Sequence, residues 1–235
     1  GVELLSTGGT AKALKAAGLT VKDVSEFTGF PEMLDGRVKT LHPKVHAGLL
    51  YLRGNAEHEA LMQQHKLEPI DLVCVNLYPF EATVAKSGVA FEEAIENIDI
   101  GGPTMLRSAA KNHAFVTVVT NPADYARVLE SLKANGGDTT PELRRELAFK
   151  VFAQQARYDG AIASYLASQG AAGSQSAPFI CVRDGGETLR YGENPHQNAV
   201  FYRDPLANEA CIAHAEILHG KEMSYNNYLD GDAAL

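Results

Sequence analysis

Residues 98–113 combine residue types that could hold an anion at the start of a helix. Asp99 is able to cap a helix, and Pro103 suits the first helical turn because its missing N–H costs nothing there. Gly101 and Gly102 let the backbone approach a ligand, while unpaired N–H groups and the positive end of the helix dipole attract negative charge. A phosphate group fits such a site, although an ordinary capped helix would give the same pattern.

Two cations follow on the same expected helix. Arg107 and Lys111 are spaced i, i+4, so both side chains lie on one helix face. They either add positive charge for a phosphorylated ligand or remain solvated as ordinary surface side chains.

A second glycine turn lies near the start of the chain. Residues 2–6 form a short apolar strand candidate, and residues 11–17 are strong helix formers that end at Gly18. The turn between them consists of Thr7, Gly8, Gly9 and Thr10. Glycines adopt positive φ at little cost and leave N–H groups free, while threonine hydroxyls donate to phosphate oxygens. The turn lacks the lysine of a Walker loop and the third glycine of a dinucleotide fingerprint, so a plain tight turn is the alternative.

Composition and charge bound the class of protein. The chain has 235 residues, of which 45% are hydrophobic and 21% are charged, enough for a substantial core. Its 21 Lys and Arg residues stand against 29 Asp and Glu residues, and the net charge of −8 argues against a general nucleic-acid or membrane-surface role. The three cysteines, Cys74, Cys181 and Cys211, are far apart and odd in number, which favours a reducing compartment. With no signal-peptide pattern and no apolar run long enough for a bilayer, the sequence predicts a cytoplasmic protein.

Apolar periodicity predicts an α/β fold with a Rossmann-like parallel sheet and helices on both of its faces. Residues 71–77 and 114–120 are near-continuous apolar runs, as expected of strands buried on both faces. Alternation with helical segments indicates βαβ units, and these segments are residues 11–17, 57–65, 91–97, 104–111 and 122–134. A long helix is expected at residues 141–168, with an apolar packing stripe of Leu143, Leu147, Val151, Phe152 and Ala156.

A small, polar, glycine-rich stretch at residues 170–178 has the composition of a linker. We expect a first domain at residues 1–169 and the N-terminal part of a second domain at residues 179–235, opening with a strand at residues 179–182. The last segment is close to the size at which a core becomes marginal. The first residues read as the interior of a strand. We therefore expect the chain to begin inside its first domain, without that domain's first strand, and to end inside its second.

Four runs of sequence occur together in an order that points to one protein family. They span residues 6–11, 29–43, 76–80 and 98–113. In this order they resemble the bifunctional purine-biosynthesis proteins that join IMP cyclohydrolase to AICAR transformylase. Two later runs, at residues 189–197 and 218–230, resemble the opening of the family's transformylase domain. The resemblance covers nearly the whole chain except the linker and residues 53–66 and 121–145.

The resemblance implies a methylglyoxal-synthase-like first domain and a second α/β domain of cytidine-deaminase-like fold. The family's first domain closes formyl-AICAR ribonucleotide into IMP with loss of water, and it needs no metal or redox cofactor. The second domain transfers a formyl group to AICAR from its cosubstrate, 10-formyltetrahydrofolate. The resemblance further implies a homodimer that binds these small nucleotides and neither nucleic acid nor a membrane.

Two departures from the family pattern bear on activity. The family begins with a strand and a Ser-x-Ser-Asp-Lys turn that also contacts the nucleotide phosphate, and no residues here correspond to them. The chain also ends before the family's Lys-His motif for formyl transfer. We therefore assign formyl transfer to the parent protein and not to these residues.

Four positions match the family's catalytic residues, namely Lys39, Tyr78, Asp99 and Lys111. An amide nitrogen is a poor nucleophile, so ring closure benefits from a proton acceptor and from donors aimed at the oxygen that gains charge. We assign proton transfer to Lys111 and polarisation of the formyl oxygen to Lys39 and Tyr78, while Asp99 orients. Residue types alone do not separate these roles. Asp99 could be only a helix cap, and Tyr78 only a packed aromatic in a turn.

The expected substrate-binding residues come from the same motifs. For the nucleotide they are Thr7, Gly8, Gly9, Thr10, Arg37, Val38, Thr40, Val75, Asn76, Asp99, Ile100, Gly101, Gly102 and Arg107. In the second domain Arg190 and Tyr191 match the family's AICAR-binding pair, and His196 either contacts AICAR or lies in a surface loop.

Other assignments compete with this one. His42 and His46 suggest a metal site, but no carboxylate or cysteine nearby completes a ligand set, so no metal is expected. A regulatory module of the methylglyoxal-synthase-like class would bind phosphate through both glycine turns without turnover. A third reading makes the chain a dimerisation fragment. Residues 37–40 and 76–78 favour the enzyme.

Overall fold

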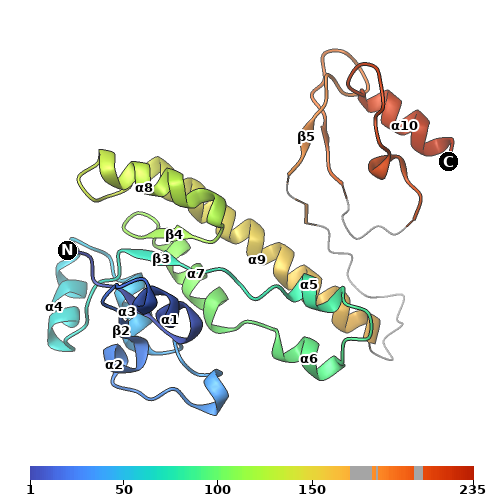
Figure 1. Ribbon diagram of the computed structural model, residues 1–235. Coiled ribbons are helices and arrows are strands. Elements are labelled where there is room, and N and C mark those ends of the chain that lie inside the picture. The colour runs from blue at the N-terminus through green and yellow to red at the C-terminus, as the bar shows by residue number, and fades with distance from the viewer. Residues whose placement is uncertain (170–181, 184, 204–208) are drawn as a thin grey trace. The chain divides into compact units, whose positions relative to one another are not determined.

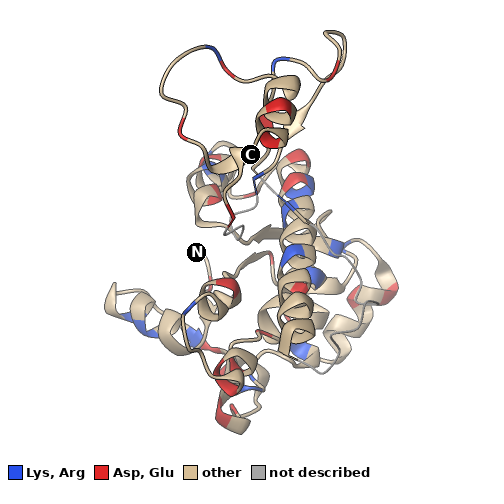
Figure 2. Ribbon diagram, turned by 90° about the vertical axis from the view of Figure 1, so that its right-hand side faces the viewer, with Lys and Arg blue, Asp and Glu red and all other residues tan. Residues whose placement is uncertain are grey.

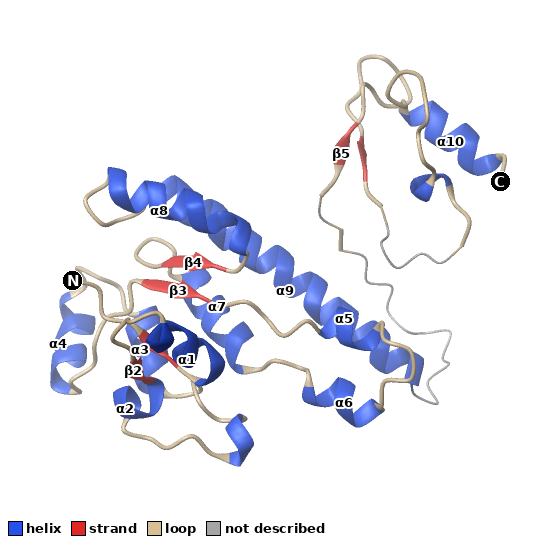
Figure 3. Ribbon diagram, in the orientation of Figure 1, coloured by secondary structure: helices blue, strands red, loops and turns tan. Residues whose placement is uncertain are grey.

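The computed structural model describes residues 1–169, 182–183, 185–203 and 209–235, which form two compact units at residues 1–174 and 175–235. Helices dominate and strands are short (Figure 3). The expected linker at residues 170–178 and Cys181 lie outside the described residues. Of the strand expected at residues 179–182 only Val182 is described, and it is not in a strand. The proposed domain bounds therefore stay a prediction.

The first half of the first unit builds the glycine turn near the N-terminus (Figure 1). Strand β1 pairs in parallel with β2, with Leu5 opposite Lys22. The elements are β1 (Leu5–Ser6), α1 (Gly8–Ala16), β2 (Lys22–Asp23), α2 (Val24–Thr28), the 3-10 helix η1 (Leu34–Gly36), α3 (Pro43–Leu50) and α4 (Ala56–Gln64).

The second half carries the longest helix. Strand β3 pairs in parallel with β4, with Leu72 opposite Thr117. The elements are β3 (Leu72–Cys74), α5 (Phe80–Val84), α6 (Phe91–Glu96), α7 (Gly101–Lys111), β4 (Thr117–Val119), the 3-10 helix η2 (Pro122–Asp124), α8 (Tyr125–Ala134) and α9 (Pro141–Gln169).

The strands are parallel as predicted within the first unit, but the single Rossmann-like sheet is a wrong prediction for the described residues. They form separate two-stranded pairs, β1 with β2 and β3 with β4. Strand β4 is buried along its length, whereas Leu72 and Cys74 of β3 are exposed, so burial on both faces holds for one of the two runs. A short apolar run gives no signal for how many neighbours its strand will have.

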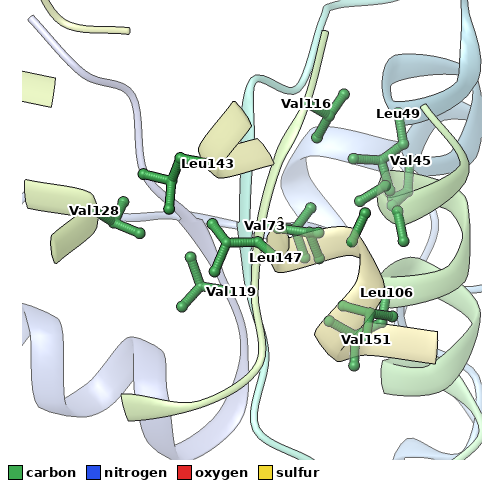
Figure 4. Close-up of a cluster of buried hydrophobic side chains, with 14 of the residues drawn as sticks. Val45, Leu49, Val73, Leu106, Val116, Val119, Val128, Leu143, Leu147 and Val151 are labelled. Atoms are coloured by element: carbon green, nitrogen blue, oxygen red, sulfur yellow. The ribbon is translucent and has the colours of Figure 1, made fainter. Parts of the chain in front are cut away.

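The core of the first unit packs α3, α7, α8 and α9 around β3 and β4 (Figure 4). Leu49, Leu106 and Val151 are fully buried there. The predicted stripe on α9 was correct for Leu143, Leu147 and Val151. It was wrong for Phe152, which is 42% exposed, and for Ala156, because a rotation of about 100° per residue carries them to the opposite face.

Both helices that follow the glycine turns begin earlier than predicted. Helix α1 starts at Gly8 rather than at residue 11, and Gly8 has a φ of +57°. Helix α7 starts at Gly101 rather than at residue 104, with the Asp99 carboxylate accepting from the Gly102 N–H at 2.9 Å. The glycines are therefore part of the first helical turns, where N–H groups have no partner inside the helix.

The second unit contains β5 (Glu187–Thr188), β6 (Val200–Phe201), the 3-10 helix η3 (Ile212–His214) and α10 (Tyr225–Ala233). Strands β5 and β6 are antiparallel, and the rings of Phe201 and Tyr228 stack at 4.0 Å. Ser224 starts α10 with a capping box completed by Asn227. These contacts give the unit a small core of its own.

The distribution of charged residues and the hydropathy of the helices match what the composition predicts. Figure 2 shows basic residues interspersed with acidic ones over the ribbon. Within the described ranges, no helix has the length and apolar character needed to cross a membrane.

Candidate active site

The loop at residues 37–40 reaches both glycine turns. The Lys39 ammonium lies 3.8 Å from the position that a Cβ on Gly8 would occupy, at the start of α1. The Thr40 hydroxyl lies 2.6 Å from the corresponding position on Gly101, at the start of α7. A side chain at Gly101 would collide with this hydroxyl, so glycine permits the close approach. One short loop thus reaches two helix starts that are 93 positions apart in the sequence.

Lys39 stands among carboxylates. Its ammonium is 2.9 Å from Glu32 Oε1, and its side chain is 29% exposed. The pKa of Asp23 is lowered, chiefly by the hydroxyl and N–H of Ser25 and further by the positive charges of Lys15 and Lys39. Lys39 is therefore a charged group held near the start of α1 with part of its surface open to a ligand.

At the start of α7 the N-cap residue is Ile100, and the carboxylate of Asp99 just before it accepts from the first-turn N–H of Gly102. A Cβ on Gly102 would lie 2.5 Å from Asp99 Oδ2, so the carboxylate packs directly against the helix backbone. The Asp99 N–H donates to the Tyr158 hydroxyl at 2.8 Å. Burial raises the pKa of that hydroxyl, which therefore stays protonated. The Ile100 side chain, in contrast, is 57% exposed.

The other residues of the loop have protein partners. The Arg37 guanidinium pairs with Glu96 at the end of α6, and its Nε lies 3.3 Å from Glu96 Oε1. Val38 forms an isolated bridge with Met33 through backbone bonds in both directions. This bridge folds the segment back on itself and holds residues 37–40 in place.

At the carboxyl end of β3, Asn76 is tied to its neighbours. Its amide nitrogen donates to Thr120 O at 3.0 Å, and its amide oxygen accepts from the Tyr125 hydroxyl at 3.0 Å. The Val75 N–H donates to Val119 O at 3.0 Å. Tyr78 follows with its side chain 57% exposed. The backbone here is fixed, and Tyr78 is open to a ligand.

Lys111 lies at the opposite end of α7 from Asp99. It is the last residue of α7, about 15 Å along the axis from Gly101 at about 1.5 Å per residue. Arg107 lies between them, with its guanidinium 5.6 Å from the centre of the Phe152 ring.

Three residues that sequence reasoning did not select contact the proposed site. Glu32 pairs with Lys39, Glu96 pairs with Arg37, and Tyr158 binds the backbone of Asp99. Glu32 lies within the run at residues 29–43, so a negative charge close to Lys39 in the sequence was the signal that could have revealed it. Glu96 and Tyr158 reach the site through tertiary contacts between distant segments, for which spacing gives no signal.

The two histidines near the site make local contacts. His42 Nδ1 accepts from the Lys44 N–H at 3.1 Å, and His46 Nδ1 lies 3.0 Å from Ser108 Oγ. Burial lowers the pKa of His46. Across the described segments, no group of three or more His, Cys, Asp or Glu side chains has a metal-binding arrangement.

In the second unit, the expected AICAR-binding pair is adjacent and accessible. The Arg190 guanidinium lies 5.6 Å from the centre of the Tyr191 ring, and Arg190 is exposed. His196 is also exposed. These residues stay predictions.

Comparison with known proteins assigns the family. The profile of the AICARFT/IMPCHase bienzyme matches residues 109–235, and that of the MGS-like domain matches residues 1–104. The chain belongs to the AICARFT/IMPCHase bienzyme family. The family predicted from the sequence motifs is confirmed.

Individual relatives of this bienzyme family cover the whole chain. It is 60% identical to the bifunctional purine biosynthesis protein PurH of Magnetococcus marinus, over 100% of this chain and 45% of the relative. It is 58% identical to PurH of Rhodospirillum rubrum, over 99% of this chain and 44% of the relative. The chain thus spans less than half the length of these relatives. A solved structure described as the crystal structure of ForH has 35% identity and a TM-score of 0.64, covering 72% of this chain and 86% of that one.

Proposed function

We propose that the first unit carries an IMP cyclohydrolase site, which closes formyl-AICAR ribonucleotide to IMP with loss of water. The main support is the loop at residues 37–40, which reaches the starts of both α1 and α7. Two helix starts and a lysine ammonium offer N–H groups and positive charge to one phosphorylated ligand. The proposal extends the family assignment from PurH relatives to this chain.

The ring closure asks for positioning and proton transfer. The carboxamide nitrogen attacks the formyl carbon and loses a proton, the formyl oxygen becomes a hydroxyl, and the adduct loses water. Lys39 and Tyr78 are proposed to donate to that oxygen, with Asp99 orienting the substrate. Lys111 is proposed to take the proton of the carboxamide nitrogen. The reaction transfers no electrons, so it needs no redox cofactor.

The finer family properties are proposed with it. The second unit is proposed to begin the cytidine-deaminase-like transformylase domain, with Arg190 and Tyr191 binding AICAR. Formyl transfer from 10-formyltetrahydrofolate is assigned to the parent protein. We also propose a cytoplasmic location, in keeping with the reduced cysteines Cys74 and Cys211.

A homodimer is proposed through the exposed face of α9. Phe149 is 71% exposed, and the apolar face continues along the helix through the exposed side chains of Phe152 and Leu166. Arg145 and Asp159 stand at equivalent distances on either side of Phe152 on this face. In an antiparallel pair of α9 helices centred on Phe152, each Arg145 meets the Asp159 of the second copy, which gives the apolar face charge complementarity to itself.

Titration with IMP followed by a turnover assay tests the proposal. IMP at about a hundredfold excess over Kd should stabilise the first unit by about 2.7 kcal/mol, and binding should weaken as salt rises. Turnover of formyl-AICAR by the same sample supports the enzyme. Binding of IMP without turnover supports the regulatory module instead, and neither binding nor turnover supports the dimerisation fragment.

A further inference from the structure

The hydroxyl of Tyr158 holds the turn that carries Asp99. Tyr158 lies on α9, 59 positions beyond Asp99 in the sequence, and accepts a hydrogen bond from the Asp99 N–H at 2.8 Å. The same hydroxyl donates to Asn97 O at a longer 3.4 Å. Both partners are backbone groups, so the contact fixes the path of the chain rather than the side chain of Asp99.

The ring of Tyr158 is itself held in place. The residue is 7% exposed, and its ring meets that of Phe80 edge to face at 6.2 Å. The Phe80 ring also contacts the ring of Tyr165, seven residues further along α9, with 5.7 Å between the ring centres. A packed ring on a long helix has few alternative rotamers, so the hydroxyl is a rigid acceptor.

The N–H groups of Asn97 and Ile98 donate to carbonyls of α6, whereas the N–H of Asp99 donates to the Tyr158 hydroxyl. One carboxylate oxygen of Asp99 accepts a hydrogen bond from the Gly102 N–H at 2.9 Å, which fixes the carboxylate relative to α7. The backbone on the other side of Asp99 has the Tyr158 hydroxyl as its partner. The two bonds together set both the position and the direction of the carboxylate at the start of α7.

We propose that Tyr158 is a positioning residue for the cyclohydrolase reaction, acting through Asp99. This inference rests on the proposed function. Tyr158 reaches no ligand itself, since its hydroxyl is occupied by backbone groups. Loss of the hydroxyl should let the 97–99 turn shift, and misplacement of a catalytic group by about 1 Å costs up to about a hundredfold in rate.

Tyr158→Phe removes the hydroxyl and keeps the packed ring. Tyr165→Phe is the matched control, because it makes the same change on the same helix and against the same Phe80 ring. Among the described residues, no hydrogen bond joins the Tyr165 hydroxyl to the turn at residues 97–99. Both variants are made in the complete gene product that carries this chain. The measurements are kcat and KM for formyl-AICAR, the melting temperature, and hydrogen exchange of the Asp99 amide.

We expect Tyr158→Phe to lower kcat by about tenfold or more, with KM changed less than about threefold and faster exchange of the Asp99 amide. Tyr165→Phe should match the parent protein in all of these. Unchanged kcat in Tyr158→Phe overturns the inference, as does an equal loss in both variants that follows melting temperature. An inactive parent protein overturns the proposed function instead, which separates the two failures.

Discussion

The carboxylate of Asp99 accepts a hydrogen bond from the backbone N–H of Gly102 at 2.9 Å, so the first turn of α7 already holds a negative charge. A ligand phosphate therefore shares this helix start with a carboxylate. The start of α1 has no such acidic residue in its first turn, and Lys39 lies beside it. The phosphate is better placed at α1, which leaves Asp99 to orient the rest of the nucleotide.

Substitution of Asp99 separates its capping role from its catalytic role. Asp99→Ala should lower the free energy of unfolding by about 1 kcal/mol, the usual value of a lost cap. Asp99→Asn keeps an oxygen that accepts from the Gly102 N–H, so its free energy of unfolding should fall by only about a few tenths of 1 kcal/mol. If the charge orients the substrate, kcat falls in both variants. Urea denaturation and turnover measure the two effects, and full activity of Asp99→Asn would reduce the residue to a cap.

The ion pair between Lys39 and Glu32 gives a second test. Lys39→Ala should weaken IMP binding by at least about tenfold, because it removes a charge-assisted bond to the ligand. Glu32→Gln should strengthen binding by up to about fivefold, since an exposed pair of about 1 kcal/mol or less no longer competes for the ammonium. Calorimetric titration with IMP compares them. Weaker binding by Glu32→Gln would mean that the carboxylate positions Lys39 rather than competes for it.

The sequence predicted the local elements better than their assembly. Helices α4, α6 and α9 lie within a residue or two of their predicted ranges, because capping residues and periodicity are local signals. The sheet was not predictable in the same way. Strands β1 and β3 are short, and each depends on a partner far along the chain.

The same contrast between local and long-range features applies to the site. The two glycine turns were recognisable from residue type, and in the structure Lys39 and Thr40 lie close to them. The partners of Arg37 and Asp99, which are Glu96 and Tyr158, come from helices whose sequences carry no sign of the site. Tertiary packing brings them there, and packing has no short-range pattern.

His46 should make stability depend on pH. Ser108 Oγ donates to Thr104 O, so the His46 Nδ1–H donates to Ser108 and leaves Nε2 to take the second proton. Nε2 is buried and has no hydrogen-bond partner among the described residues. Burial accordingly lowers the pKa of His46 from its ordinary value of 6.5. Between the lowered pKa and 6.5 the unfolded chain binds more protons than the folded one.

Stability from this residue is therefore complete above pH 6.5 and is lost as the pH falls towards the lowered pKa. Urea denaturation at about pH 7.5 and about pH 5.5 measures the change. His46→Gln should be less stable than the parent at the higher pH and should lose less on acidification. An equal loss in both proteins would assign the acid sensitivity to other groups.

The exposed face of α9 predicts the effect of a charge at its centre. Phe149→Glu should convert a dimer to a monomer, since a carboxylate in an apolar interface loses its hydration without gaining a partner. Leu129→Glu is the control, because Leu129 is 51% exposed on a different helix, α8. Light scattering coupled to size-exclusion chromatography gives the mass. A Phe149→Glu protein that remains a dimer would place the interface elsewhere.

Lys111 carries the proposed proton transfer, and its place at the far end of α7 makes the test sharp. Lys111→Arg keeps the positive charge in the last turn of the helix, so helix stability and most of the IMP affinity should be retained. Guanidinium does not deprotonate near neutral pH, so a proton-transfer role should be lost. We expect kcat to fall by about a hundredfold or more, with Kd for IMP changed only several-fold.

Lys133→Arg is the matched control for Lys111→Arg. Lys133 is likewise the basic residue in the last turn of a helix, α8, and is exposed. It should behave as the parent protein in both kcat and Kd, which removes any general effect of a Lys-to-Arg change at a helix end. If Lys111→Arg keeps the parent kcat, its charge rather than its proton matters, and Lys39 becomes the candidate for proton transfer.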